Sequence, residues 1–426
     1  MPAVSMSRRS FGAALLGVVG LAVVGGCSKL PAASAGSGIF DDGLVHDIDL
    51  AFERADYDAM IDAYLNDQDK TWIEATVTID GTTFEKAGLR LKGNSTLRGL
   101  DQTGAAGPGG SISSGNPQDL PWLVRLDKYT EGQQLGGYSE FVVRSNNTDS
   151  ALNEAVALEL LGLAGLATQK SVSTRLSVNG GTEALRLIVE NPGDKWDADN
   201  FPSAGILYKA ESGGDYSYRG DDAEAYKDVF DQETDTDNAN VAPLAAFLKF
   251  INQSDDATFG ADLGRHLDVA AFATYLAFQE LVKNSDDIDG PGNNSYLRYT
   301  TEKDQFTVVA WDHNLTFGAM GGGRGGLKNG GGAPREGGGG APREGGGGAG
   351  RMGARSNILV TRFSANKTFK ESYDEALTGL RTSLYTSGKA AEILQSRAAV
   401  LIAEASDLIS AETVTSESAT IKGYFA

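Results

Sequence analysis

The sequence predicts a mixed α+β protein in two lobes, because its two halves carry different hydrophobic periods. Short alternating runs dominate the first half, such as residues 72–79 (WIEATVTI). Helical apolar spacing dominates the second half, as in residues 241–251 and 269–282. Alternation is typical of strands and a period of about 3.6 is typical of helices. A strand-rich part followed by a helix-rich part is therefore expected.

In the first half, residues 48–65 are expected to open as a strand and continue as a helix. The strands expected next are residues 72–79, 88–92, 122–126 and 140–144, with a glycine-rich loop at 104–116. A helix begins after Asp149 or Ser150, either of which can cap it, because apolar residues from Leu152 onward recur at helical spacing. Residues 174–178 and 185–190 flank Asn179-Gly180 and predict a hairpin.

In the second half, the polar segment 283–294 separates a helix from two short strands at 295–299 and 306–311. Residues 318–353 are rich in glycine and repeat the sequence GAPREGGG. Such a composition cannot bury a core, so we expect a disordered insertion. From Ser356 onward, two amphipathic helices are expected to run to the end of the chain.

Composition excludes several classes of function. The chain has 426 residues and a net charge of −20, with no basic stripe, which argues against a nucleic-acid partner. One cysteine and three histidines exclude internal disulfides and make a cysteine- or histidine-rich zinc site unlikely to form. Any metal would be held by oxygen atoms, which points to magnesium, calcium or manganese.

The first residues predict an exported bacterial lipoprotein. Residues 1–26 combine Arg8 and Arg9 with a short apolar run and resemble a twin-arginine signal peptide. Val24-Gly25-Gly26-Cys27 looks like a lipobox, so Cys27 is the expected lipidation site and residues 27–44 the tether. The protein would then be anchored to a membrane, at the cell surface or in the periplasm. The alternative is an ordinary cleaved signal with Cys27 as a bystander.

The densest polar cluster lies in residues 286–294, between a helix and a strand that is apolar on both faces. That strand ends in Trp311-Asp312-His313-Asn314. An acid at the end of a buried strand is costly without a partner, and a divalent cation is one such partner. A hairpin would bring Asn294 close to Asp312, which suits magnesium held against phosphate oxygens. The alternatives are a structural calcium ion or acids that are simply solvated.

Eight segments in a fixed order resemble the CotH kinase family, whose members are spore-coat and secreted proteins. These segments are residues 88–96 (GLRLKGNST), 122–129 (WLVRLDKY), 145–154 (SNNTDSALNE), 177–180, 188–190, 207–209 (LYK), 284–299 and 310–312. The resemblance implies an atypical protein-kinase-like fold with two lobes. It assigns residues 45–317 to the kinase-like domain and residues 354–426 to its C-terminal helices, with the insertion 318–353 between them.

The resemblance also implies roles for the polar residues. Asp312 matches the metal-binding aspartate after a buried strand, and Asn294 matches a second metal ligand. Asp286 fits the family's Asn-x-Asp pattern and is the favoured catalytic base, while Asp289 has the spacing of the kinase D-x-x-x-x-N loop and stays open. Asn314 stands where the family usually has a second metal-binding aspartate, which weakens the site by one charge.

Cations of the first half would bind the nucleotide. Arg90 and Lys92 flank a turn whose backbone N–H groups suit phosphate oxygens. Arg125 is expected in the place of the kinase strand lysine, with Glu154 as its ion-pair partner. Two further candidates are Lys209, which would bind the nucleotide in place of the other cations, and Glu190. Glu190 would lie near the adenine side of the site or would only cap the hairpin.

The resemblance therefore implies a membrane-anchored enzyme that moves the γ-phosphate of ATP to Ser or Thr hydroxyls of a protein at the cell surface. Its metal would be Mg²⁺ or Mn²⁺. A second interpretation is a surface binding or scaffold lipoprotein that keeps the fold without the chemistry, since ATP is scarce outside the cytoplasm. A third is a calcium-stabilised adhesin that uses the same acids structurally.

Overall fold

The computed structural model describes residues 38–94, 96–100, 112–211, 213–290, 293–319 and 357–426. The expected signal peptide, the lipidation site Cys27, most of the tether and nearly all of the glycine-rich insertion lie outside the described residues. Within the described ranges, no helix combines the length and apolar character that crossing a membrane requires.

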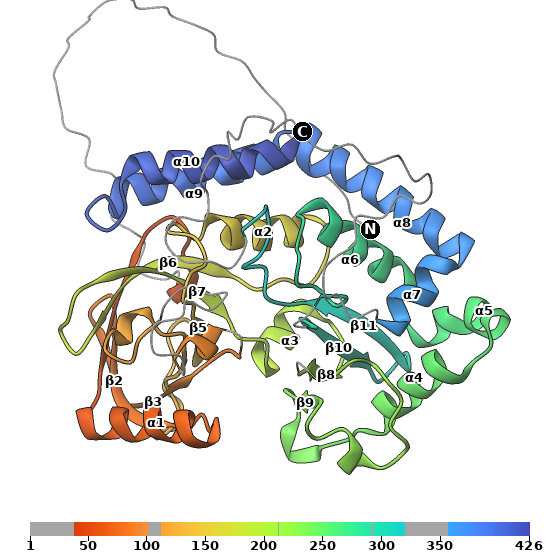
Figure 1. The fold of residues 1–426 in the computed structure, drawn as a ribbon, viewed down its shortest axis with the longest axis horizontal. Coiled ribbons are helices and arrows are strands. Elements are labelled where there is room, and N and C mark those ends of the chain that lie inside the picture. Colours follow the sequence, from red (N-terminus) through yellow and green to blue (C-terminus); the bar gives the residue numbers. More distant parts are fainter. Residues whose placement is uncertain (1–37, 95, 101–111, 212, 291–292, 320–356) are drawn as a thin grey trace, which may run out of the picture. The chain divides into compact units, whose positions relative to one another are not determined.

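A closed barrel of seven strands forms the first part of the described chain (Figure 1). Around the barrel the strands follow in the order β1 (His46–Ala51), β2 (Ile73–Ile79), β3 (Thr82–Leu91), β4 (Trp122–Arg125), β5 (Glu140–Val143), β7 (Ala184–Glu190) and β6 (Ser171–Val178). Neighbouring strands are antiparallel except β1 and β6, which pair in parallel with Ile48 opposite Leu176. Burial alternates along β1, so Ile48 and Leu50 point into the barrel.

A second sheet of four antiparallel strands follows in the order β11 (Gln305–Ala310), β10 (Ser295–Thr300), β8 (Gly205–Ala210) and β9 (Phe230–Gln232). The helices that come with it are α3 (Asp194–Asn200), α4 (Ala242–Gln253), α5 (Asp256–His266) and α6 (Val269–Leu281). The mixed α+β class predicted from the sequence is thus confirmed, with most strands in the first half.

Two further helices belong to the barrel part of the chain. Helix α1 (Arg54–Asp67) lies under the barrel and buries Tyr57, Met60 and Tyr64. Helix α2 (Leu152–Leu163) connects β5 to β6 and is almost entirely buried. Its apolar residues join the core of the second sheet and of the C-terminal helices. Helix α2 therefore contacts both parts of the protein.

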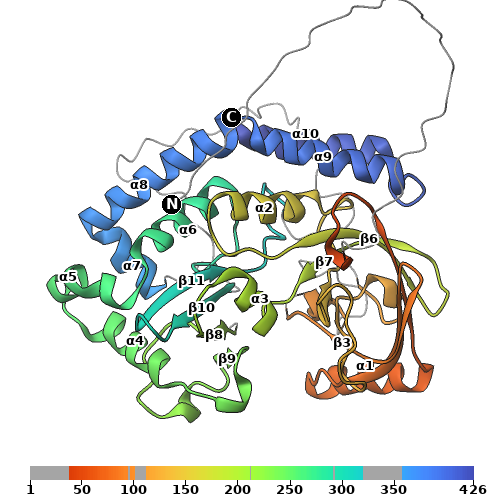
Figure 2. The same ribbon diagram turned by 180° about the vertical axis from the view of Figure 1, so that it is seen from behind.

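The prediction of two C-terminal helices is wrong. The chain after residue 356 forms α7 (Ile358–Ala365), α8 (Lys367–Leu380), α9 (Lys389–Glu404) and α10 (Ala411–Lys422). Capping residues divide the apolar pattern: Asn366 accepts hydrogen bonds from the first turn of α8, and Ser410 does the same for α10. Figures 1 and 2 show α9 and α10 running along α2.

A small apolar cluster joins the barrel to the second sheet. Its buried members are Leu123 and Val142 from the barrel, Leu207, Tyr296 and Val309 from the sheet, and Trp196 and Trp311 beside them. Tyr296 and Trp311 meet edge to face, with ring centroids 5.7 Å apart. Two of the polar residues singled out from the sequence, Asn294 and Asp312, lie beside the ends of β10 and β11.

Candidate functional site

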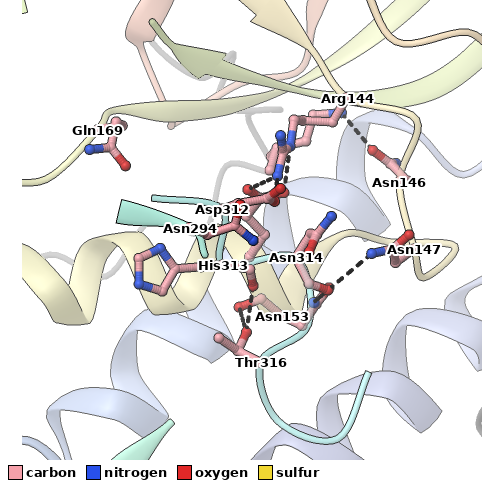
Figure 3. A network of polar contacts seen from close by, with 12 residues as sticks. Arg144, Asn146, Asn147, Asn153, Gln169, Asn294, Asp312, His313, Asn314 and Thr316 are labelled. Carbon is pink, nitrogen blue, oxygen red and sulfur yellow. Dashed lines mark hydrogen bonds and ion pairs between the residues drawn. The ribbon is translucent and has the colours of Figure 1, made fainter. Parts of the chain in front are cut away.

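The candidate site begins at one end of the β10–β11 hairpin. Ser295 pairs with Ala310, so Asn294 just before β10 and Asp312 just after β11 lie at the same end of the hairpin (Figure 3). Asp312 has a φ of 59°, a left-handed conformation that turns the chain sharply as the strand ends. The sequence predicted this proximity from the hairpin alone.

Arg144, which directly follows β5, connects Asp312 to helix α2. Its Nη2 lies 2.7 Å from Glu154 Oε1 and its Nε lies 3.0 Å from Glu154 Oε2. The same Nη2 makes a close contact with Asp312 Oδ1. The guanidinium of Arg144 therefore forms a bidentate ion pair with Glu154 and also contacts the carboxylate of Asp312, which belongs to another element.

Electrostatics favour the charged form of Arg144 in this group of Arg144, Glu154 and Asp312. Burial opposes the charge on Arg144, but Asp312 and Glu154 raise its pKa above the usual value. Burial raises the pKa of Glu154, and Arg144 counteracts this increase. The side chains of Arg144 and Glu154 are only 13% and 5% exposed, so water screens the pair weakly.

The expected pairing of Arg125 with Glu154 is wrong. Arg125 Nε instead lies 2.9 Å from Asp127 Oδ1, and the Arg125 side chain is 45% exposed at the outer end of β4. The strand that leads into α2 is β5, and the residue after β5 is Arg144. Arg144 therefore takes the place that the sequence suggested for Arg125.

The loop before β10 distinguishes the two candidate catalytic acids. The Asn294 side chain donates a 2.9 Å hydrogen bond to the backbone oxygen of Asp286. Gly290 permits this tight turn, because a Cβ there would lie 2.5 Å from the Cα of Asp286. Asp289 Oδ1 instead accepts a 2.6 Å hydrogen bond from the Asn357 backbone at the start of α7. The geometry therefore favours Asp286 as the acid beside Asn294.

Two of the predicted phosphate-binding cations, Arg90 and Lys209, lie close enough to a third, Lys92, to affect its pKa. Burial lowers the pKa of Lys92 to about 8; Glu233 counteracts this effect, whereas the charges of Lys209 and Arg90 add to it. Lys92 Nζ donates a 3.3 Å hydrogen bond to Asn191 Oδ1. The structure thus brings the cations at the end of β3 close to Lys209 on β8.

Arg90 and Lys209 are held differently within this group of cations. The guanidinium carbon of Arg90 lies 4.8 Å from the centroid of the Trp72 ring, a cation–π contact. Its buried Nε has no hydrogen-bond partner. Lys209 makes a close ion pair with Glu211, two residues further along the chain. Arg90 therefore keeps an unused donor, while Lys209 already has an anionic partner.

Glu190 ends β7 and is 2% exposed. Its Oε2 accepts a 3.1 Å hydrogen bond from the Lys170 backbone, and burial raises the pKa of its carboxyl group. The next residue, Asn191, accepts a hydrogen bond from Lys92, so Glu190 lies near the cations. The Glu190 carboxylate itself binds a backbone N–H group instead. These contacts favour the interpretation of Glu190 as a cap of the β6–β7 hairpin.

Sequence reasoning missed the contacts that hold the loop after β11. The Asn153 side chain on α2 donates a 2.7 Å hydrogen bond to the backbone oxygen of Asn314, and Thr316 Oγ1 donates one of 3.0 Å to the backbone oxygen of Asn153 (Figure 3). His313 is fully buried, which lowers its pKa to about 4 and keeps the ring neutral. The first turn of α2 therefore supports this loop.

The predicted metal ligands Asp312 and Asn294 supply oxygen atoms. The described residues include no group of three or more His, Cys, Asp or Glu side chains that suits a metal ion. Asp312 contributes one carboxylate, of which Arg144 contacts one oxygen, and Asn294 contributes an amide. Such a set fits magnesium that keeps water and phosphate oxygens, and it falls short of the six to eight ligands typical of calcium.

The family model described as CotH kinase protein matches residues 89–407, most of the chain. The chain belongs to the CotH kinase family. A search of the curated proteins found no match. The region shared with the CotH family contains every predicted catalytic, cofactor-binding and metal-binding residue, from Arg90 to Asn314. It ends at Asp407, before α10 begins.

Proposed function

We propose that this CotH-family protein is a kinase-like phosphotransferase that moves the γ-phosphate of ATP to Ser or Thr hydroxyls of a protein. The arrangement of Asp312 at the end of a strand, connected through Arg144 to Glu154 on α2, carries the proposal. A kinase likewise needs an acid for its metal and an ion pair between a basic residue on a strand and a glutamate on a helix. In this proposal the barrel is one lobe, and the second sheet with its helices is the other.

Asp312 and Asn294 would hold the Mg²⁺ or Mn²⁺ ion, which neutralises phosphate charge when it is bound. Arg90, Lys92 and Lys209 would bind the phosphate oxygens of ATP. Burial lowers the pKa of Lys92 to about 8, and a phosphate beside this amine would favour its charged form. Family membership supports ATP and a divalent metal in general.

Asp286 would act on the acceptor hydroxyl. The hydrogen bond from Asn294 to its backbone holds this residue beside the proposed metal ligand. Its carboxylate would orient the hydroxyl and accept its proton as the new oxygen–phosphorus bond forms and the bond between the γ-phosphorus and the departing ADP breaks. Asp289 contributes to the start of α7 instead, which leaves it a structural role.

The proposal places the enzyme on the outside of a bacterial membrane, through a lipid on Cys27, with a protein partner at the cell surface. The pattern of residues 1–27 supports the anchor. Replacing Cys27 by Ser should move the protein from the membrane fraction to the soluble fraction. A Cys27→Ser protein that stays with the membranes would show that the lipobox interpretation is wrong.

A binding protein without phosphotransfer is the second candidate, and one contact favours it. Arg144 already neutralises Asp312, the single carboxylate of the proposed metal ligands, and Asn314 adds no charge. Such a protein would bind ATP and a metal without transferring phosphate. The calcium-stabilised adhesin has less support, because the described residues offer no cluster of three acids.

Labelled ATP distinguishes these functions. The purified protein with Mg²⁺ or Mn²⁺ should label itself or an added protein, and Asp312→Ala should abolish the labelling. Asp62→Ala, which removes an exposed aspartate of α1, is the matched control and should keep the activity. A rise in melting temperature with ATP and metal but no labelling would identify the binding protein. Stabilisation by calcium alone would support the adhesin.

A further inference from the structure

We infer that Glu417 on α10 is a positioning residue of the site: it fixes the first turn of α2 and, through that turn, the loop that carries Asp312. The inference deepens the proposed function, and its structural half can be tested without ATP. Helix α10 lies beyond the part of the chain that the family model matches. No motif in the sequence connects α10 with the site.

Both carboxylate oxygens of Glu417 bind the segment that leads into α2. Oε1 accepts a 3.0 Å hydrogen bond from the Asp149 backbone, and Oε2 accepts one of 3.0 Å from the Ser150 backbone. The Ser150 hydroxyl also donates to Oε2 in a close contact. Glu417 is 7% exposed, and a buried carboxylate is tolerated only when hydrogen bonds satisfy it in this way.

Helix α2 lacks a capping side chain at its own N-cap residue. This residue is Ala151, with a φ of 54°, and no side-chain cap comes from it. Ser150 Oγ accepts a 3.2 Å hydrogen bond from the Leu152 backbone while it donates to Glu417. A carboxylate near a helix N-terminus also interacts favourably with the helix dipole. Glu417 therefore stabilises the start of a helix whose N-cap residue supplies no capping side chain.

The same turn of α2 supports the site on its other side. Asn153 holds the backbone of Asn314, Thr316 holds the backbone of Asn153, and the next residue, Glu154, holds Arg144. Figure 3 shows Asn153 between Asn314 and Thr316. One helical turn thus lies between the contact with Glu417 and the contacts with the Asp312 loop.

A second buried charge from the C-terminal helices binds the middle of α2. Arg397 on α9 makes a close ion pair with Glu159, and it donates a 2.9 Å hydrogen bond to the Ser171 backbone at the start of β6. Arg397 is 8% exposed. Because α9 and α10 hold α2 at two points, the helix that carries Glu154 has little freedom to move as a rigid body.

The decisive experiment is amide hydrogen exchange on the full-length protein without ligand, comparing Glu417→Gln with the wild type. Gln would place an N–H₂ group where a carboxylate oxygen now accepts a donor, so one contact becomes repulsive. We expect exchange to accelerate at the amides of Ala155 in α2 and Phe317 after the Asp312 loop, which donate to Ala151 and Val282. Amides of α1 should keep their rates.

Glu412→Gln is the matched control, because Glu412 is an exposed carboxylate on the first turn of the same helix. This variant should exchange like the wild type everywhere. Faster exchange at Ala155 with an unchanged Phe317 amide would overturn the inference, since Glu417 would then be only a local cap. If Glu417→Gln fails to fold, Ser150→Ala removes one of the three donors and is judged by the same two amides.

Phosphate transfer supplies the second readout. Glu417→Gln should lower kcat roughly tenfold to a hundredfold, the range expected when a site is displaced by about an ångström. The KM for ATP should change less than twofold, because the three cations Arg90, Lys92 and Lys209 contact other elements. Their partners are Trp72, Asn191 and Glu211, none of which lies on α2. A rise in KM alone would contradict the positioning role. If the wild type transfers no phosphate, the proposed function fails, while the exchange at Phe317 still decides whether α10 and the loop are coupled.

Discussion

The acidic and the cationic sides of the site are organised differently. On the acidic side, Asp312 and Glu154 share Arg144, and hydrogen bonds from α2 fix the adjoining loop. On the cationic side, Lys92 is buried near two other cations and its pKa falls to about 8 although Glu233 lies nearby. The acids thus already have a charged partner within the protein, whereas an added anion would stabilise the charged form of the cations.

This difference indicates which side a ligand must rearrange. A phosphate chain would relieve the repulsion among Arg90, Lys92 and Lys209, and it would compete with Glu211 for Lys209. A metal would approach Asp312 beside Arg144, in a frame that α2 already holds. Substitutions on the acidic side should therefore affect folding and catalysis together, and those on the cationic side should affect mainly ATP affinity.

The largest effect is expected from Arg144→Met. Removing one partner of a buried ion pair leaves Glu154 charged without compensation, which costs about 3–5 kcal/mol of folding free energy. Phosphate transfer should be lost as well, because Asp312 loses its connection to α2. Urea unfolding and labelling with ATP measure the two effects. Arg144→Lys keeps the charge but not the bidentate contact with Glu154. Its stability and its activity should lie between those of Arg144→Met and the wild type.

Lys209→Met addresses the cationic side. A hydrogen bond from a charged group contributes about 1.5–3 kcal/mol, so ATP affinity should fall roughly tenfold to a hundredfold while the unfolding midpoint changes little. Titration calorimetry with ATP and metal measures the affinity. Lys195→Met is the matched control, since Lys195 is an exposed lysine with a 2.9 Å ion pair to Asp199. Equal losses in both variants would mean that Lys209 contributes only general charge.

The pH dependence of ATP binding should come from Lys92. Because its pKa of about 8 lies below the ordinary value of 10.5, the free protein loses this proton as the pH rises above 8. Bound phosphate favours the protonated amine, so ATP affinity should be highest below about pH 8 and fall above it. Between about pH 8 and 10.5 the unfolded chain holds more protons, so stability relative to Lys92→Met should rise with pH.

Calorimetry in buffers of different ionisation heat checks the first part of this prediction. At about pH 9, ATP binding to the wild type should take up a proton, and binding to Lys92→Met should not. Proton uptake that persists in Lys92→Met would assign the titration to another group. The second part is checked by urea unfolding across the same pH range.

Local pattern predicted much of the fold and part of the site. The β10–β11 hairpin places Asn294 and Asp312 at the same end of two paired strands, and apolar periodicity located α2 and the β6–β7 hairpin. Contacts between distant elements were beyond such reasoning. Glu417 binds Asp149 across 268 residues of sequence, and no local signal points to that pairing. Arg144 left a clearer signal, because it is the last positively charged residue before the helix that carries Glu154.

Arg125 ends β4 and Arg144 follows the neighbouring strand β5, and burial decides which of them matters. Arg125 is 45% exposed and pairs with Asp127, so Arg125→Gln should change the free energy of unfolding by less than about 1 kcal/mol, as is usual for a surface ion pair. Phosphate transfer should stay at the wild-type level, because Glu154 keeps Arg144. Urea unfolding and ATP labelling beside Arg144→Met measure the contrast. A loss of activity in Arg125→Gln comparable to that in Arg144→Met would restore Arg125 to the site, and the acidic side would then extend to β4.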